Sequence, residues 1–138
     1  MPDSPPDLSE ENALTDARLL GRYGEALAAE YLRSRKYRII GMNYRTRFGE
    51  IDIIAVNRKF VIFAEVKLRK SGSFAEAREF VTRTKQRRIA SAAELWLQSN
   101  PQKLQPRFDI IEIYAPDGEK TEKPEIRHWE NAFTLDSF

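Results

Sequence analysis

The fold of this chain is decided by residues 48–69, Phe-Gly-Glu-Ile-Asp-Ile-Ile-Ala-Val-Asn-Arg-Lys-Phe-Val-Ile-Phe-Ala-Glu-Val-Lys-Leu-Arg. Two segments rich in Ile, Val and Phe flank the polar residues 57–59, a pattern that predicts two buried strands joined by a short turn. Charged side chains are rarely buried unless they are paired or bind a metal ion. Four charged residues nevertheless interrupt these strands: Glu50, Asp52, Glu65 and Lys67. We therefore look for the functional site in this hairpin.

The pairing register of the hairpin determines which charges share a face, because a shift of one residue sends each side chain to the opposite face. If Val56 pairs with Val61, Asp52 lies opposite Glu65, and Glu50 lies opposite Lys67. Side chains on one face of a strand recur with a period of two, so all four charges then gather at the open end of one face. A cross-strand ion pair would explain two of these charges, but it would leave two carboxylates facing each other, which is destabilising without a cation.

Whole-chain composition restricts the class of protein. The 138 residues include no Cys, which excludes disulfides, thiolate metal sites and cysteine nucleophiles and fits a reducing compartment. Every apolar run is too short to span a membrane and no signal peptide is recognisable, so we expect a soluble cytoplasmic protein without a membrane partner. Residues 1–14 predict a disordered acidic tail, and residues 15–138 predict a single domain.

Charge is distributed unevenly along the chain. Residues 33–107 hold 18 basic and 6 acidic residues, which gives +12, whereas the whole chain has a net charge of +2. The segments on either side of this basic region are both acidic. A polyanion such as nucleic acid is the natural partner of such a region. The alternative is that Lys and Arg only keep a small domain soluble.

A first helix is predicted over residues 16–35, with Thr15 as its N-cap. Its predicted core stripe recurs at helical spacing and consists of Leu20, Tyr23, Leu27 and Tyr31. Gly21 and Gly24 each cost about 1 kcal/mol against Ala inside a helix, so we expect the helix to approach a neighbouring element closely on their side. Such an approach would point Glu25 at the neighbouring element. The alternative is that Glu25 lies at the edge of the stripe and faces solvent.

A second helix is predicted to begin after Thr82, its N-cap, and to end before Pro101. Lys85 and Gln86 lie one turn before the buried stripe that starts at Ile89, where they are placed to hold a phosphate. Further candidates for nucleic-acid contact are the basic residues of this helix and of the loop before it: Arg69, Lys70, Arg83, Arg87 and Arg88.

Three further strands complete the predicted α/β domain: residues 37–45, irregular around Gly41, residues 108–114, and an edge strand at residues 126–129. His128 in this edge strand is the single histidine, and the chain has no nucleophile-elbow motif, Walker loop or dinucleotide fingerprint. A Ser-His-acid hydrolase is therefore not favoured, and a structural role is expected for His128.

The facing carboxylates of Asp52 and Glu65 suit a hard divalent cation. Mg²⁺ prefers oxygen ligands, takes one or two carboxylates from the protein, and keeps water or substrate phosphate in its remaining positions. Bound Mg²⁺ polarises a phosphodiester and lowers the pKa of a coordinated water. Lys67 would orient the attacking water or neutralise the developing charge, and Glu25 would add a third carboxylate from the helix.

Gly49-Glu-Ile-Asp52, followed by Glu65-Val-Lys67, resembles the signature of the PD-(D/E)XK nuclease superfamily. More narrowly, the chain resembles the YraN-like family of small bacterial endonuclease-related proteins over about residues 19–133. The segments that carry this resemblance include Gly21-Arg-Tyr-Gly-Glu25, Asn43-Tyr-Arg45, Phe63-Ala-Glu-Val-Lys67, Arg107-Phe-Asp109 and Ile126-Arg-His-Trp-Glu-Asn-Ala-Phe133.

The resemblance implies a restriction-endonuclease-like mixed β-sheet flanked by α-helices, as in Holliday-junction resolvases. It implies Asp52 and Glu65 as ligands of Mg²⁺ or Mn²⁺, Lys67 as the catalytic lysine, and Glu25 and Lys85 as the acidic and basic positions on the flanking helices. The implied activity is endonucleolytic hydrolysis of DNA, branched or damaged DNA included, by a monomer or a homodimer.

Two other functions are compatible with the same sequence. One is a nucleic-acid-binding module that has the nuclease fold but no turnover, which the basic middle region favours independently of the acids. The other is a protein-interaction subunit that docks through Trp129 or Phe133.

Overall fold

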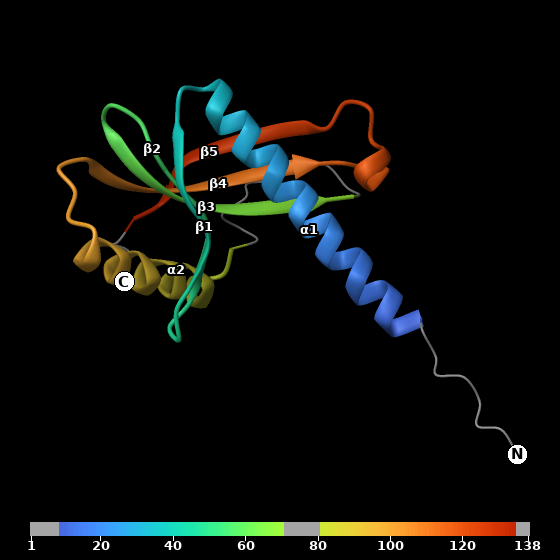
Figure 1. The fold of residues 1–138 in the computed structure, drawn as a ribbon, viewed down its shortest axis with the longest axis horizontal. Coiled ribbons are helices and arrows are strands. Elements are labelled where there is room, and N and C mark those ends of the chain that lie inside the picture. Colours follow the sequence, from blue (N-terminus) through green and yellow to red (C-terminus); the bar gives the residue numbers. More distant parts are fainter. Residues whose placement is uncertain (1–8, 71–80, 135–138) are drawn as a thin grey trace, which may run out of the picture.

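A computed structural model of the chain describes residues 9–70 and 81–134. In chain order the elements are α1 (Ser9–Ser34), β1 (Arg38–Arg45), β2 (Glu50–Val56), β3 (Phe60–Arg69), α2 (Arg83–Ser99), β4 (Gln105–Tyr114), the short 3₁₀ helix η2 (Gly118–Lys120) and β5 (Glu125–Phe133) (Figure 1). The five strands form one sheet in the order β1-β2-β3-β4-β5.

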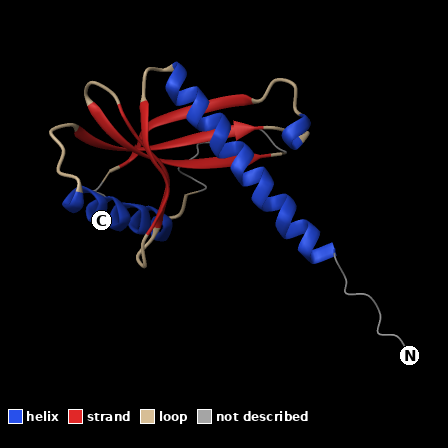
Figure 2. Cartoon of the chain, in the orientation of Figure 1, coloured by secondary structure: helices blue, strands red, loops and turns tan. Residues whose placement is uncertain are grey.

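The sheet is mixed because one connection crosses over. β3 and β4 are parallel, and the other neighbouring strands are antiparallel. Parallel neighbours need a long crossover connection, and α2 lies in this connection. Helices α1 and α2 lie on opposite sides of the sheet (Figure 2). This is the α/β arrangement expected of a restriction-endonuclease-like fold, so the predicted fold class is confirmed.

The two faces of the sheet bury separate cores. On the α2 side, Phe63 of β3 packs with Trp96 of α2 and Phe108 of β4, with ring centroids 5.7 Å apart in both pairs. On the α1 side, the small residues Ala28 and Ala29 pack against the other face of the sheet. Because both faces of β2 and β3 are covered, these strands need apolar residues at almost every position, as their sequence has.

The predicted register of the central hairpin is confirmed where its strands pair. Val56 lies opposite Val61, and the pairing continues to Ile53 opposite Ala64. The turn has no glycine; instead Oδ1 of Asn57 accepts hydrogen bonds from the backbone N–H groups of Lys59 and Phe60, at 2.9 and 2.8 Å. An Asn side chain that bonds the backbone two residues on is a common way to build such a turn.

The first helix differs from its prediction in two respects. It begins at Ser9 rather than after Thr15, which therefore lies inside the helix and is not its N-cap. Residues 9–14, predicted as part of the tail, belong to α1; they include two glutamates near its N-terminus, where acidic residues are favourable. Residues 1–8 lie outside the described part of the chain.

The buried face of α1 is also not the predicted stripe. Gly24, Ala28 and Leu32 are buried against the sheet. The residues of the predicted stripe are only half-buried, beside this contact. The reason is close packing: a Cβ on Gly24 would lie 3.5 Å from Leu68, so small residues form the contact. The expected close approach is confirmed at Gly24, but it is wrong at Gly21, where a Cβ would meet nothing within 4 Å.

The remaining elements follow the sequence closely. Thr82 caps α2 by accepting a hydrogen bond from Lys85 N, and the helix ends at Ser99. β1 is irregular between Ile39 and Gly41, as predicted. β5 is longer than the predicted edge strand. No helix in the described ranges is long and apolar enough to cross a membrane.

Candidate active site

The charged residues of the hairpin lie on the face of the sheet that α2 covers. Ile54 and Phe63 belong to the core on that side. Asp52 is two residues before Ile54, and Glu65 is two residues after Phe63, so both carboxylates point to the same face just beyond this core. The predicted gathering of Asp52 and Glu65 at one end of one face is therefore borne out.

Asp52 is fixed by the backbone of the neighbouring strand. The paired part of β2 and β3 stops at Ile53 and Ala64. Beyond it, Oδ2 of Asp52 accepts a hydrogen bond of 2.8 Å from the N–H of Val66. This bond holds the carboxyl group directly beside Glu65.

The electrostatics of the two carboxyl groups favour a cation between them. Burial is the largest cause that raises the pKa of Asp52 from 3.8 to about 7, and the negative charge and hydrogen bond of Glu65 contribute to the same rise. The N–H of Val66 acts in the opposite direction, and Glu25 adds a smaller repulsion. Near neutral pH the pair therefore retains a proton that a divalent cation would replace.

Glu65 is neutralised by a residue of α2. Its carboxylate is 5% exposed, and its Oε1 lies 2.5 Å from Nζ of Lys85. Burial lowers the pKa of Lys85, but the hydrogen bond and charge of Glu65 outweigh this effect and raise the pKa above its ordinary value. Lys85, predicted as a phosphate-binding residue, thus lies in the candidate site itself.

The predicted ion pair between Glu50 and Lys67 is wrong. Because the β2–β3 pairing ends at Ile53, Glu50 instead lies opposite Arg45 of β1, and their side chains form an ion pair of 3.3 Å. Lys67 lies beside the buried Glu112 in the β3–β4 register. Among the described residues, the Lys67 side chain makes no ion pair or hydrogen bond, so its charge is free to act on a ligand.

Glu25 approaches the site from α1 without joining the two acids. Its Oε2 accepts a hydrogen bond of 3.0 Å from Asn43 of β1, and its charge still contributes to the raised pKa of Asp52. Within the described ranges there is no group of three or more His, Cys, Asp or Glu side chains arranged to hold a metal ion. Asp52 and Glu65 are therefore the two acids that could bind a metal ion. Two carboxylates suit Mg²⁺, which keeps water in its remaining coordination positions.

The predicted nucleic-acid contacts are spread over three places. Arg88 lines a cavity of about 760 Å³ between the β1–β2 loop and the start of α2, which we call the loop cavity. Arg83 and Arg87 are exposed on α2 outside its lining, and Lys70 is exposed at the end of β3. Arg69 is 3.8 Å from Glu112 on the sheet face.

Gln86, predicted to hold a phosphate, instead makes a local hydrogen bond to the backbone. Its Nε2 donates a hydrogen bond of 2.9 Å to the carbonyl of Val81, just before α2 begins. The side chain thus helps to fix the start of α2, which in turn positions Lys85 for its contact with Glu65.

Sequence reasoning missed Arg45, Arg47 and Phe48, which line the loop cavity, and the buried acid Glu112. Burial raises the pKa of Glu112, although the charges of Arg69 and Arg127 oppose this. The loop residues could not be recognised because their neighbour across the cavity is α2, which is far away in sequence. The one available signal was the segment Arg45-Thr46-Arg47-Phe48, in which a Phe directly follows two closely spaced arginines.

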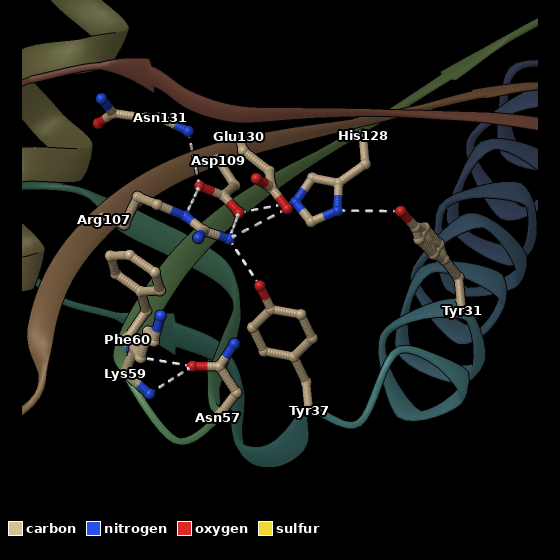
Figure 3. A network of polar contacts seen from close by, with 10 residues as sticks. All are labelled: Tyr31, Tyr37, Asn57, Lys59, Phe60, Arg107, Asp109, His128, Glu130 and Asn131. Atoms are coloured by element: carbon tan, nitrogen blue, oxygen red, sulfur yellow. Dashed lines mark hydrogen bonds and ion pairs between the residues drawn. The ribbon is translucent and has the colours of Figure 1, made fainter.

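A second polar network lies on the α1 side of the sheet (Figure 3). Asp109 of β4 is fully buried and accepts hydrogen bonds from Nε and Nη2 of Arg107, both at 2.8 Å, and from the N–H of Asn131. His128 Nε2 lies 2.6 Å from Asp109, and Tyr37 accepts a hydrogen bond from Arg107.

This network ties α1 and β5 to β4. Burial alone would raise the pKa of Asp109, but the hydrogen bonds from His128 and Arg107 hold it below the ordinary value. Because Asp109 is then a carboxylate, His128 donates through Nε2, and its Nδ1 accepts from the hydroxyl of Tyr31, 3.0 Å away. Both ring nitrogens of His128 thus have a hydrogen-bond partner within the fold, which fits the structural role expected for this residue.

Comparison with known proteins places the chain in a family. The uncharacterised protein family UPF0102 matches residues 24–113, which contain the hairpin and α2. The chain belongs to the UPF0102 family. The family resemblance inferred from the motifs is thereby confirmed.

UPF0102 proteins from several bacteria resemble the chain over most of its length. A relative from Alkaliphilus oremlandii is 43% identical over 117 residues, which are 83% of this chain and 97% of the relative. A relative from Geotalea daltonii is 42% identical over 121 residues, 87% of this chain and 93% of the relative. The candidate site therefore lies within the part that UPF0102 proteins share.

Proposed function

We propose that this UPF0102 protein is a Mg²⁺- or Mn²⁺-dependent endonuclease that hydrolyses phosphodiester bonds in DNA. The observation that carries the proposal is the pair Asp52 and Glu65, a half-buried and a buried carboxyl group that are hydrogen-bonded to each other on one face of the sheet. Such a pair is unfavourable in a purely structural protein, since nearby like charges destabilise the fold. A cytoplasmic location fits the absence of Cys.

Asp52 and Glu65 would hold the metal ion. When bound, it would polarise the scissile phosphodiester and lower the pKa of a coordinated water. The N–H of Val66 keeps the Asp52 carboxylate oriented through its 2.8 Å hydrogen bond. Lys67 supplies a positive charge on the same face, where it would stabilise the negative charge that develops on the phosphate oxygens.

Lys85 has two roles in this proposal. Without metal it neutralises Glu65, at 2.5 Å. Glu65 would share its charge with a bound cation, which would weaken the ion pair and allow the Lys85 ammonium group to bind a substrate phosphate. Lys85 lines the loop cavity, so this phosphate would enter from there.

A cleavage assay tests the proposal. Purified protein is incubated with Mg²⁺ or Mn²⁺ and linear, flapped and four-way DNAs. We expect cleavage that Asp52→Asn and Glu65→Gln abolish, while the matched control Glu94→Gln, an exposed acid on α2, retains it. Cleavage that survives Asp52→Asn and Glu65→Gln would refute the assignment.

The second candidate function is nucleic-acid binding without turnover. The loop cavity favours it, because Arg45, Arg47 and Arg88 line this cavity beside the acids. Salt-sensitive binding of DNA in EDTA, combined with no cleavage in either metal, would support this function over the endonuclease.

A further inference from the structure

The loop cavity combines cationic side chains with an exposed aromatic ring. Arg45, Arg47, Lys85 and Arg88 line it, together with Phe48. Phe48 is 48% exposed, and it is the one aromatic residue among the large apolar side chains that are exposed in the described ranges. Phe48 therefore places an exposed aromatic ring beside these cations.

The cations of the cavity are open to an anionic ligand. In the described part of the chain, Arg47 and Arg88 form no ion pair with a carboxylate. Arg45 pairs with Glu50, but both side chains are largely exposed, and exposed pairs contribute little. A phosphodiester could therefore compete for Arg45 and bind Arg47 and Arg88 directly.

The ring of Phe48 presents a flat surface for stacking. The guanidinium carbon of Arg47 lies 4.8 Å from its centroid. Nucleobases stack on aromatic rings with little sequence preference, because every base has a π face. The guanidinium of Arg47 lies over one face of the ring, so a base would stack on the opposite face. The cation and the ring together are complementary to the phosphate and the base of one nucleotide.

The loop that carries Phe48 is held rigidly. Thr46 accepts hydrogen bonds at its Oγ1 from the N–H groups of Phe48 and Gly49, at 3.0 and 3.1 Å. Gly49 packs so tightly on α2 that a Cβ would lie 2.3 Å from the carbonyl oxygen of Arg88. The loop backbone beside Phe48 is therefore held against α2, and stacking on the ring would cost little ordering of the loop.

The loop cavity adjoins the candidate active site. Lys85 lines the cavity and contacts Glu65. A second cavity, of about 610 Å³, is lined by Arg18, Arg22 and Glu25 on the α1 side, and Arg45 lines both cavities. The two cavities thus share Arg45.

We propose that the loop cavity binds a nucleotide whose base is unstacked from its neighbours, with Phe48 stacked on the base and Arg47 and Arg88 on the flanking phosphates. The inference rests on the proposed function and names its substrate class: single-stranded DNA, or DNA with unpaired nucleotides beside the scissile bond. Both faces of a base are covered in an intact duplex, so Phe48 has no surface to stack on there.

Binding measurements in EDTA test this inference without any need for turnover. Fluorescence anisotropy compares a labelled single strand of about 12 nucleotides with the blunt duplex of the same sequence, within the usual site sizes for strand-binding proteins. We expect the single strand to bind more tightly. Phe48→Ala should weaken single-strand binding about 5- to 100-fold, because each stacked base contributes about 1–3 kcal/mol, and should leave duplex binding unchanged.

Two controls accompany this measurement. Phe48→Trp keeps a stacking surface and should retain single-strand binding. Ile40→Ala removes another exposed apolar side chain, on β1 and outside the loop cavity, and should have no effect. The inference is overturned if Phe48→Ala weakens single strand and duplex equally, if it weakens neither, or if the wild type binds both equally well.

The outcomes separate this inference from the proposed function. A Phe48-dependent preference for single strands, without cleavage in Mg²⁺ or Mn²⁺, would refute the endonuclease and support the binding site. Metal-dependent cleavage of a single strand at the same sub-saturating rate by wild type and Phe48→Ala would support the endonuclease and refute the binding site.

Discussion

Nζ of Lys85 on α2 lies 2.5 Å from Oε1 of Glu65 on β3, so a helix residue neutralises one of the two acids proposed to bind metal. The pair joins the α2 crossover to the central hairpin at the point where the apolar core ends. It also explains how the half-buried Asp52 and the buried Glu65 are tolerated side by side in the absence of metal: a proton stays with Asp52, and an ammonium group stays with Glu65.

Removal of this ammonium group is expected to make stability depend on metal. Lys85→Gln should lower stability by about 1–2 kcal/mol in EDTA, less than the cost of breaking a fully buried pair because the Lys85 side chain is 44% exposed. Mn²⁺ should restore much of this loss, since the cation neutralises Glu65. Thermal unfolding with EDTA and with Mn²⁺ measures both effects. Lys103→Gln, an exposed lysine, is the control, and equal losses with and without Mn²⁺ would contradict the expectation.

The raised pKa of Asp52 gives stability a pH dependence of known sign. The folded state holds this proton up to about pH 7, whereas the unfolded state loses it near pH 3.8. The wild type should therefore lose stability as the pH rises from about 4 to about 7. Asp52→Asn lacks this titration and should be more stable than the wild type by about 1–2 kcal/mol at pH 8 in EDTA.

Unfolding midpoints of the wild type and Asp52→Asn across this pH range provide the measurement. The difference between the two proteins should grow with pH and level off above 7. A difference that stays constant with pH would mean that Asp52 is ionised in the folded state throughout.

The buried network around Asp109 is expected to be a large contributor to stability. Asp109→Asn would leave Arg107, 8% exposed, without its carboxylate and should cost about 3–5 kcal/mol. Urea unfolding of this variant is compared with that of Asp117→Asn, an exposed acid in the turn before η2, which should change stability little. A small loss at Asp109 would show that water or a rearranged hydrogen bond satisfies Arg107.

Two glycines should respond in opposite directions to alanine. Gly49→Ala places a Cβ 2.3 Å from the Arg88 carbonyl oxygen, so the loop must move away from α2 at a cost of about 1–3 kcal/mol. Gly21→Ala meets nothing within 4 Å on an exposed helix and should stabilise the fold by up to about 1 kcal/mol. Chemical denaturation of both variants checks the pair, and a neutral Gly49→Ala would contradict the tight contact between loop and helix.

Much of the fold could be predicted from local patterns. The hairpin register follows from the short loop that places Val56 opposite Val61, and the limits of α2 follow from Thr82 and Pro101. The start of α1 and its buried face were wrong, because apolar spacing favoured the large residues of the helix. Close packing on the sheet selected Gly24 and Ala28 instead.

The candidate site was predictable only in part. Asp52 and Glu65 could be paired because they belong to one hairpin. Extending the same register to the end of the hairpin gave Glu50 the wrong partner, because the pairing of β2 and β3 ends at Ile53. Phe133, considered as a docking residue, is buried and stacks on Phe108 with centroids 4.9 Å apart. The contact between Lys85 and Glu65 depends on a crossover helix, whose position relative to the sheet no local pattern determines.

Calorimetric titration of Mn²⁺ into the wild type and Asp52→Asn tests the central claim most directly, with Glu94→Gln as the matched control. The account predicts one Mn²⁺ site in the wild type and in Glu94→Gln, and at least a roughly tenfold loss of affinity in Asp52→Asn, since a loss of about 1.4 kcal/mol is expected for one missing carboxylate charge. Equal binding by the wild type and Asp52→Asn, or no binding by the wild type, would contradict the account.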